Sequence, residues 1–363
     1  MAEQAIALRA PFPWFGGKSR AASLVWDHFG DVAHYAEPFA GSLAVLLRRP
    51  PTHRRRLETV NDLDCHICNF WRSVQADPEA VITAADWPIS EPDLHARHAY
   101  LVEWLTPERR EHFMCDPTYC EPKLAGWWVW GISQWIGGGW CEDLAARRAS
   151  RQPPQLGPSS NGIHKSTWRK RPITADGKGR DGVRGIHSRT LRKRPMIGAL
   201  MNTPGVGCHV VVGDWTGLIL ALQERLRHVK IISGDWRRVL TTAAIGTPDQ
   251  GGKVCGVFLD PPYLGTTGRQ ARLYAQDSLV IADEVRAWAL ENGERPQLRI
   301  ALAGLAGEHD DLEAHGWAAV RWSAGGGRSH GEGEAAARRH LETIWFSPTC
   351  EARQMSFAME ATP

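Results

Sequence analysis

In the first 75 residues, short continuous apolar runs alternate with segments in which apolar residues recur at helical spacing. Each short run ends in a turn and indicates a strand, and the segment after the turn indicates a helix. Strands are expected at 34–39 and 59–60, and helices at 19–29, 42–49 and around 67–74. Pro50 and Pro51 must end the second of these helices, because proline cannot continue a helix. The order of strand, turn and helix indicates a parallel α/β sheet.

The same alternation returns in the last third of the chain. Strands are expected at 229–232, 254–259 and 298–303, helices at 216–228, 278–292 and 308–315, and a closing hairpin at 317–322 and 340–346. Before them, residues 77–140 have helical spacing, and we interpret the tryptophans from Trp127 to Trp140 as packing. We therefore predict one α/β domain in two parts, 1–76 and 216–363, which bracket an insertion at 77–215.

Composition places the chain among soluble globular proteins. It has 363 residues, of which 43% are hydrophobic and 23% charged, enough to bury a core without disulfides. No apolar run reaches the roughly 18 residues of a membrane span, and the N-terminus lacks the pattern of a secretory signal. The 8 cysteines are irregularly spaced, which favours a reducing, cytoplasmic location.

Charge is distributed very unevenly along the chain. The segment from Arg147 to His209 holds 14 Lys or Arg against 2 Asp or Glu, whereas the rest has 29 basic and 38 acidic residues. Within it, the triplet Arg169, Lys170 and Arg171 recurs 23 residues later as Arg192, Lys193 and Arg194. Such a segment indicates contact with a polyanion, and the alternative is a solvated loop.

The tetrapeptide Asp260-Pro261-Pro262-Tyr263 follows an apolar strand directly. Open α/β sheets bind ligands at the carboxyl ends of their strands. The two prolines lack N–H groups, so their carbonyls and the Asp260 carboxylate are free to accept hydrogen bonds. With Tyr263 as a stacking face, this arrangement suits a planar base that carries an exocyclic amino group. The alternative is an ordinary Asp-Pro-Pro turn.

Three further segments have the pattern of a nucleoside-binding sheet. Glu37, Pro38, Phe39 and Gly41 form a turn between a strand and a helix, where the backbone can approach a ligand. Asn61 and Asp62 follow the next strand, where an acidic side chain can hold ribose hydroxyls. The alternative for Asp62 is a helix N-cap. Asp235 and Trp236 follow a later strand and could bind and cover an adenine ring.

Taken in order, and together with Trp14, Gly16, Gly17 and Lys18, these motifs resemble the Dam-like DNA adenine methyltransferases, the D12 or alpha class. The resemblance covers 11–75 and 229–347. It implies a Rossmann-like S-adenosylmethionine-dependent methyltransferase sheet with an inserted target-recognition region. Two positions depart from the family pattern: Leu43 stands where the family has a second glycine, and Trp236 replaces Phe or Tyr.

The resemblance also assigns residues to roles. Those implied to contact S-adenosylmethionine are Trp14, Gly16, Gly17, Lys18, Glu37, Pro38, Phe39, Gly41, Asn61, Asp62, Asp235, Trp236 and Asp260. Asp260 to Tyr263 would hold an adenine flipped out of double-stranded DNA, whose amino group attacks the methyl group directly. The two basic triplets and Arg20 would contact phosphates. A monomer is compatible with this scheme.

Two other functions stay open at this point. One is the same chemistry on another amino group, such as that of cytosine, although the aspartate of the tetrapeptide favours adenine. The other is a catalytically silent DNA-binding homologue, which Leu43 would support. A metal site is not favoured, because the zinc-like pair Cys65 and Cys68 lies on an expected helix and no second pair matches its spacing.

Overall fold

The structure is a computed structural model that describes residues 8–14, 18–53, 57–135, 140–141, 214–241, 245, 254–262, 271–322 and 342–351. The chain divides into two compact units, which are described separately. Unit 1 contains residues 1–17 and 62–235, and unit 2 contains residues 18–61 and 236–363. The predicted boundaries at 76/77 and 215/216 stay a prediction. Among the described residues, no helix combines the length and the hydropathy that a membrane span requires.

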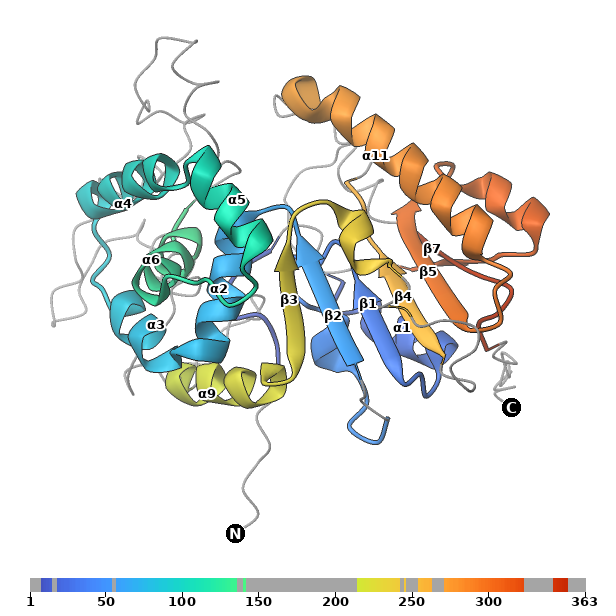
Figure 1. The fold of residues 1–363 in the computed structure, drawn as a ribbon, viewed down its shortest axis with the longest axis horizontal. Coiled ribbons are helices and arrows are strands. Elements are labelled where there is room, and N and C mark those ends of the chain that lie inside the picture. The colour runs from blue at the N-terminus through green and yellow to red at the C-terminus, as the bar shows by residue number, and fades with distance from the viewer. Residues whose placement is uncertain are drawn as a thin grey trace, which may run out of the picture. The chain divides into compact units, whose positions relative to one another are not determined.

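Seven strands form a sheet in the order β3-β2-β1-β4-β5-β7-β6 (Figure 1). They are β1 (His34–Glu37), β2 (Leu57–Asp62), β3 (Val229–Ser233), β4 (Cys255–Leu259), β5 (Leu298–Leu305), β6 (Ala318–Arg321) and β7 (Glu342–Phe346). Strand β1 pairs in parallel with β2 and β4, and β4 pairs in parallel with β5. Strand β7 is antiparallel to both β5 and β6. The predicted α/β fold and the closing hairpin are confirmed.

The helices follow the expected order along the chain. They are α1 (Ala22–Phe29), α2 (Cys65–Ala76), α3 (Pro78–Ala85), α4 (Glu91–Trp104), α5 (Pro107–Cys115), α6 (Pro122–Ile132), α9 (Trp215–Leu226) and α11 (Ala271–Asn292). Short 3-10 helices are η1 (Leu46–Arg48), η3 (Trp236–Val239) and η4 (Asp310–His315). Several helices begin where the sequence supplies a cap: Ser90, for example, accepts a hydrogen bond from the Asp93 backbone N–H at the start of α4.

Unit 2 is built around strands that are buried on both faces. Every residue of β1 and β4 is buried, as expected for parallel strands that are covered on both sides. Helices α1 and α11 both pack on β5, and α11 is the long orange helix of Figure 1. Gly256 lets α1 approach β4, because a Cβ at this position would lie 2.7 Å from the Phe29 ring. The glycine therefore fixes how closely this helix packs on the sheet.

Unit 1 is mainly helical, and its core is aromatic. Phe12 packs edge-on against Phe70 and Trp128, with ring centroids 5.3 and 5.1 Å apart. Helices α3 and α6 approach closely at Gly126, where a Cβ would lie 2.7 Å from the Val81 carbonyl oxygen. Trp128, Trp130 and Trp135 are all buried, so the interpretation of this tryptophan-rich stretch as packing is confirmed for them.

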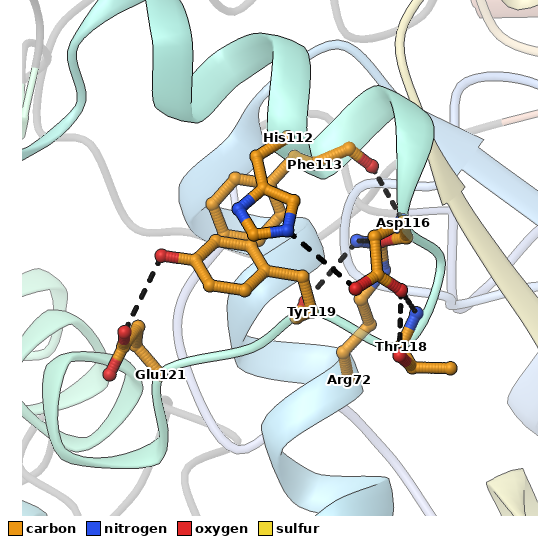
Figure 2. A network of polar contacts seen from close by, with 7 residues as sticks. All are labelled: Arg72, His112, Phe113, Asp116, Thr118, Tyr119 and Glu121. Carbon is orange, nitrogen blue, oxygen red and sulfur yellow. Dashed lines mark hydrogen bonds and ion pairs between the residues drawn. The ribbon is translucent and has the colours of Figure 1, made fainter.

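A buried arginine joins three segments of unit 1 (Figure 2). The Arg72 side chain extends from α2 and donates to the carbonyls of Phe113, Asp116 and Tyr119 at 3.1, 3.0 and 3.3 Å. Its Nε donates to the Ile231 carbonyl of β3 at 2.9 Å. Each acceptor is a backbone oxygen, so one guanidinium satisfies the end of α5, the loop that follows it and a strand.

The loop that Arg72 holds is also fixed from outside. His112 stacks on Tyr119 with ring centroids 4.1 Å apart, and its Nε2 lies 3.7 Å from Oδ2 of Asp116 (Figure 2). The Asp116 carboxylate also accepts from the Thr118 backbone N–H at 2.8 Å, which is the geometry of an Asx turn. Hydrogen bonds from Thr118 lower the pKa of the Asp116 carboxyl.

The expected helix at 42–49 is wrong. The structure has only η1 in this stretch, because Leu43 adopts a left-handed backbone conformation with φ of 54°. A residue in that conformation cannot be part of a right-handed helix. Two other differences are smaller: the segment at 308–315 is the 3-10 helix η4, and α11 begins at Ala271 rather than at 278.

At Leu43 we expect a glycine variant to be more stable than an alanine variant, which is the reverse of the usual order. Its side chain is completely buried, so truncation to alanine should cost about 2–5 kcal/mol of unfolding free energy. Glycine loses the same packing but relieves the left-handed backbone, so Leu43→Gly should be more stable than Leu43→Ala by about 1 kcal/mol. Urea denaturation of both variants measures the difference.

The matched control is Leu46, which is equally buried in η1. In the described structure, the φ of Leu46 is not positive. There Leu46→Gly should be less stable than Leu46→Ala, because glycine loses more conformational entropy on folding. The same order at both positions would contradict the interpretation of Leu43.

Candidate active site

The site in unit 2 lies where its strands end. Strands β1 and β4 are parallel neighbours, so Glu37, the last residue of β1, and Asp260, which follows β4, lie at the same edge of the sheet. Strand β7 runs the other way, and its first residue, Glu342, pairs with Leu305 at the end of β5. Three carboxylates from distant parts of the sequence therefore lie at the carboxyl edge of the parallel strands, where open α/β sheets bind ligands.

A buried lysine connects two of these carboxylates. Lys18 is 3% exposed, and its Nζ lies 3.1 Å from Oδ2 of Asp260 and 4.0 Å from Oε2 of Glu342. Its carbonyl accepts from the Ala22 N–H at 2.9 Å, which ties the lysine to the start of α1. The sequence placed Lys18 with the cofactor motif, and the structure adds its ion pair with the first residue of the tetrapeptide.

Glu342 was missed by sequence reasoning. Burial raises the pKa of its carboxyl, the Asp260 charge raises it further, and Lys18 opposes both effects. A single glutamate at the start of a strand carries no motif. The only available signal would have been its place at the beginning of an antiparallel strand, which returns the chain to the edge where the parallel strands end.

The turn after β1 is held by the end of β2. Asn61 donates from Nδ2 to the Pro38 carbonyl at 3.0 Å, and its own carbonyl accepts from the Ala40 N–H at 2.8 Å. Gly41 follows with φ of 45°, a conformation that glycine adopts without strain. The structure thus brings three predicted residues of unit 2, Pro38, Gly41 and Asn61, into one compact turn.

The side chains on either side of this turn are also fixed. The Tyr35 hydroxyl donates to Oε2 of Glu37 at 3.0 Å, and burial with the Glu37 charge raises the Tyr35 pKa well above its usual value. Phe39 stacks on Trp236, with ring centroids 6.2 Å apart and planes at 26°. The Trp236 indole Nε1 is buried and has no hydrogen-bond partner in the described structure.

The predicted residues of unit 1 are described separately. Asp62 accepts the Asp64 N–H at 2.9 Å, and Asp64 itself caps α2 by accepting the His66 N–H at 2.8 Å. The alternative that Asp62 is the N-cap is therefore wrong. Trp14 packs against Phe12, with centroids 6.0 Å apart, and Asp235 is exposed after β3.

Several predicted residues lie outside the described part of the chain. They are Gly16, Gly17, Tyr263, Arg169, Lys170, Arg171, Arg192, Lys193 and Arg194. Arg20 is described and is exposed just before α1. The Cys65 and Cys68 pair lies on α2 as expected. Both side chains are buried, and the Cys68 thiol donates to the carbonyls of Asp62 and Ile232 at 3.4 and 3.5 Å.

The mixed seven-stranded sheet with its helices fits the fold of a Rossmann-like methyltransferase. Residues 14–103 match the family model described as D12 class N6 adenine-specific DNA methyltransferase. Over these residues the match confirms the resemblance to Dam-like DNA adenine methyltransferases. The family implies DNA as the substrate, adenine as the methylated base and a methyl donor. A search of curated proteins finds no match.

Proposed function

We propose that the protein transfers a methyl group from S-adenosylmethionine to the exocyclic amino group of adenine in double-stranded DNA. The ion pair between Asp260 and the buried Lys18, at the end of β4, carries this proposal. It holds a carboxylate in a fixed place at the ligand-binding edge of the sheet. Two prolines follow, so the backbone there offers acceptors without competing donors.

The chain's own residues position and polarise the amino group. One oxygen of Asp260 contacts Lys18, and the carboxylate together with the Pro261 carbonyl would accept the two amino hydrogens. These hydrogen bonds draw the nitrogen lone pair out of conjugation with the ring and orient it. No covalent enzyme intermediate is needed, because positioning and electrostatics suffice for direct transfer. The adenine would have to leave the duplex, at a cost of a few kcal/mol.

The residues present fit S-adenosylmethionine. When bound, it would supply an electrophilic methyl group on a positively charged sulfur. In unit 2 the Phe39–Trp236 pair offers an aromatic face, and the buried Trp236 Nε1 is a donor that still lacks an acceptor. The turn at Gly41 lets the backbone approach a ligand closely. We assign the other predicted cofactor contacts as Trp14, Gly16, Gly17, Lys18, Glu37, Pro38, Asn61, Asp62 and Asp235.

Leu43 does not favour a catalytically silent homologue. The residue that stands in place of the family's glycine has a left-handed backbone with φ of 54°, a conformation that glycine adopts readily. Its side chain is completely buried, so it lines no solvent-accessible cofactor pocket. The glycine-like backbone supports a working cofactor turn. The basic triplets at 169–171 and 192–194, with Arg20, are the proposed phosphate contacts.

The proposal predicts transfer of labelled methyl groups to adenine. The full chain is incubated with methyl-labelled S-adenosylmethionine and duplex DNA, the DNA is digested to nucleosides, and the labelled base is identified. We expect the label on N6-methyladenine. Label on methylcytosine would replace adenine with the other candidate base, and DNA binding without any transfer would overturn the proposal.

A further inference from the structure

Glu342 is part of the site although no motif contains it. It is the first residue of β7, which pairs antiparallel with β5, and its partner Leu305 is the last residue of β5. Strand β5 in turn pairs in parallel with β4, whose end carries Asp260. The backbone alone therefore places Glu342 at the edge where the methyl acceptor is expected.

Among the residues that the structure describes, two charged side chains act on Glu342. Its Oε2 is buried, forms no hydrogen bond in the described structure, and lies 4.0 Å from the Lys18 Nζ. The charged groups that face it are Lys18, from the start of α1, and Asp260, from the end of β4. Among the neighbouring strands, β5 presents the apolar Leu305, and the Trp322 N–H after β6 donates only to the Glu342 carbonyl.

One buried ammonium is thus shared between two carboxylates. When Glu342 is ionised, the three side chains together carry one net negative charge. When Glu342 is protonated, they are neutral, and Lys18 is drawn more strongly to Asp260. The two states leave different electron density on the Asp260 oxygens, which must accept hydrogen bonds from the adenine amino group in the proposed function.

We propose that Glu342 is a positioning residue for methyl transfer, which acts by holding Lys18 between two carboxylates so that Asp260 stays free to bind the amino group. This inference rests on the proposed function. The ionised form is the active one, because its net negative charge complements the positive charge that the amino nitrogen gains as it is methylated. Glu342 itself contacts Lys18 and not the reacting atoms.

The pH dependence follows from the sign of the pKa shift. Because burial raises the pKa of Glu342, the carboxylate becomes protonated at a higher pH than an exposed glutamate would. The rate of transfer should therefore fall on the acid side as Glu342 is protonated. Folding has the opposite sign: stability is greatest below the unfolded pKa of Glu342 and decreases as the pH rises through its folded pKa. Glu342→Gln should fold, since it removes a charge that burial penalises.

The test is single-turnover methyl transfer by the full chain as a function of pH. We expect Glu342→Gln to lower the rate about 10- to 100-fold at neutral pH, as for partners that orient an active group indirectly. The acid limb of the profile should disappear, and the KM for duplex DNA should stay unchanged. Glu342→Asp should restore part of the rate together with the acid limb. Glu313→Gln, an exposed residue of η4 in the same unit, is the control and should behave as the wild type.

The outcomes separate this inference from the proposed function. If the wild type transfers no methyl to adenine, the proposed function fails. If the wild type is active and Glu342→Gln has the same rate and the same pH profile, the inference is overturned while the function stands. A variant that keeps its rate but raises the KM for DNA would also overturn it. If Glu342→Gln does not fold, the rate and acid limb of Glu342→Asp decide in its place.

Discussion

Asp260→Ala is expected to abolish methyl transfer while leaving the affinity for duplex DNA largely intact. The carboxylate at the end of β4 is the group proposed to accept the amino hydrogens, and it is held by the Lys18 ion pair at 3.1 Å. Loss of one preorganised polar contact to a transition state costs about 10²–10³-fold in rate. Here the carboxylate also orients the nucleophile, so the loss should be at least of that size. Single-turnover transfer and a DNA-binding titration measure the two quantities.

Asp260→Asn is the matched variant. It retains the shape and one acceptor oxygen but loses the charge that balances Lys18. We expect it to transfer more slowly than the wild type and faster than the alanine variant. Thermal unfolding of each variant shows whether a rate is lost because the protein unfolds, since the alanine variant removes the 3.1 Å contact of the buried Lys18. Transfer by folded Asp260→Ala at the wild-type rate would remove Asp260 from the mechanism.

Arg72→Met is expected to destabilise unit 1 more than any surface substitution. The side chain is 3% exposed, and its guanidinium donates to four backbone carbonyls of the α5 end, the loop after it and β3. Methionine keeps the apolar stem but leaves these acceptors buried without donors. Breaking such a buried polar network costs about 3–5 kcal/mol of unfolding free energy. Urea denaturation followed by tryptophan fluorescence provides the measurement.

The control for this variant is Arg227→Met in the same unit. Arg227 is 64% exposed and pairs only with Glu224 in the described structure, within one helical turn. Its replacement should change stability by less than about 0.5 kcal/mol. Equal effects at both positions would show that the Arg72 hydrogen bonds contribute no more than a solvated pair does.

The periodic parts of the fold could be predicted from the sequence. Strands β3 and β4 were expected within one residue of their observed bounds, because a short apolar run between turn residues has few other solutions. The helix at 42–49 failed for a local reason. Leucine has no intrinsic preference for positive φ, so nothing in its identity indicated that Leu43 would adopt a left-handed backbone.

The residues of the candidate site could be predicted only where they belong to contiguous sequence motifs. Asp260 and the turn at Gly41 were found because their neighbours are diagnostic. The contact of Lys18 with Asp260 and Glu342 depends on how three distant elements meet, and no spacing along the chain encodes it. The choice between Asp62 and Asp64 as the N-cap of α2 was a local one, and it depended on a difference of two residues in where the helix begins.

The path of the chain constrains how unit 1 could be exchanged by recombination. Unit 1 is formed by two separate segments, and Phe12, from the short N-terminal one, packs into the aromatic core that the long one supplies. If only residues 62–235 were exchanged, the core residues of unit 1 would change while Phe12 stayed the same. Phe12 would then have to pack against a different set of side chains. A successful exchange therefore requires that the new segment keep the aromatic residues that contact Phe12, or that both segments be replaced together.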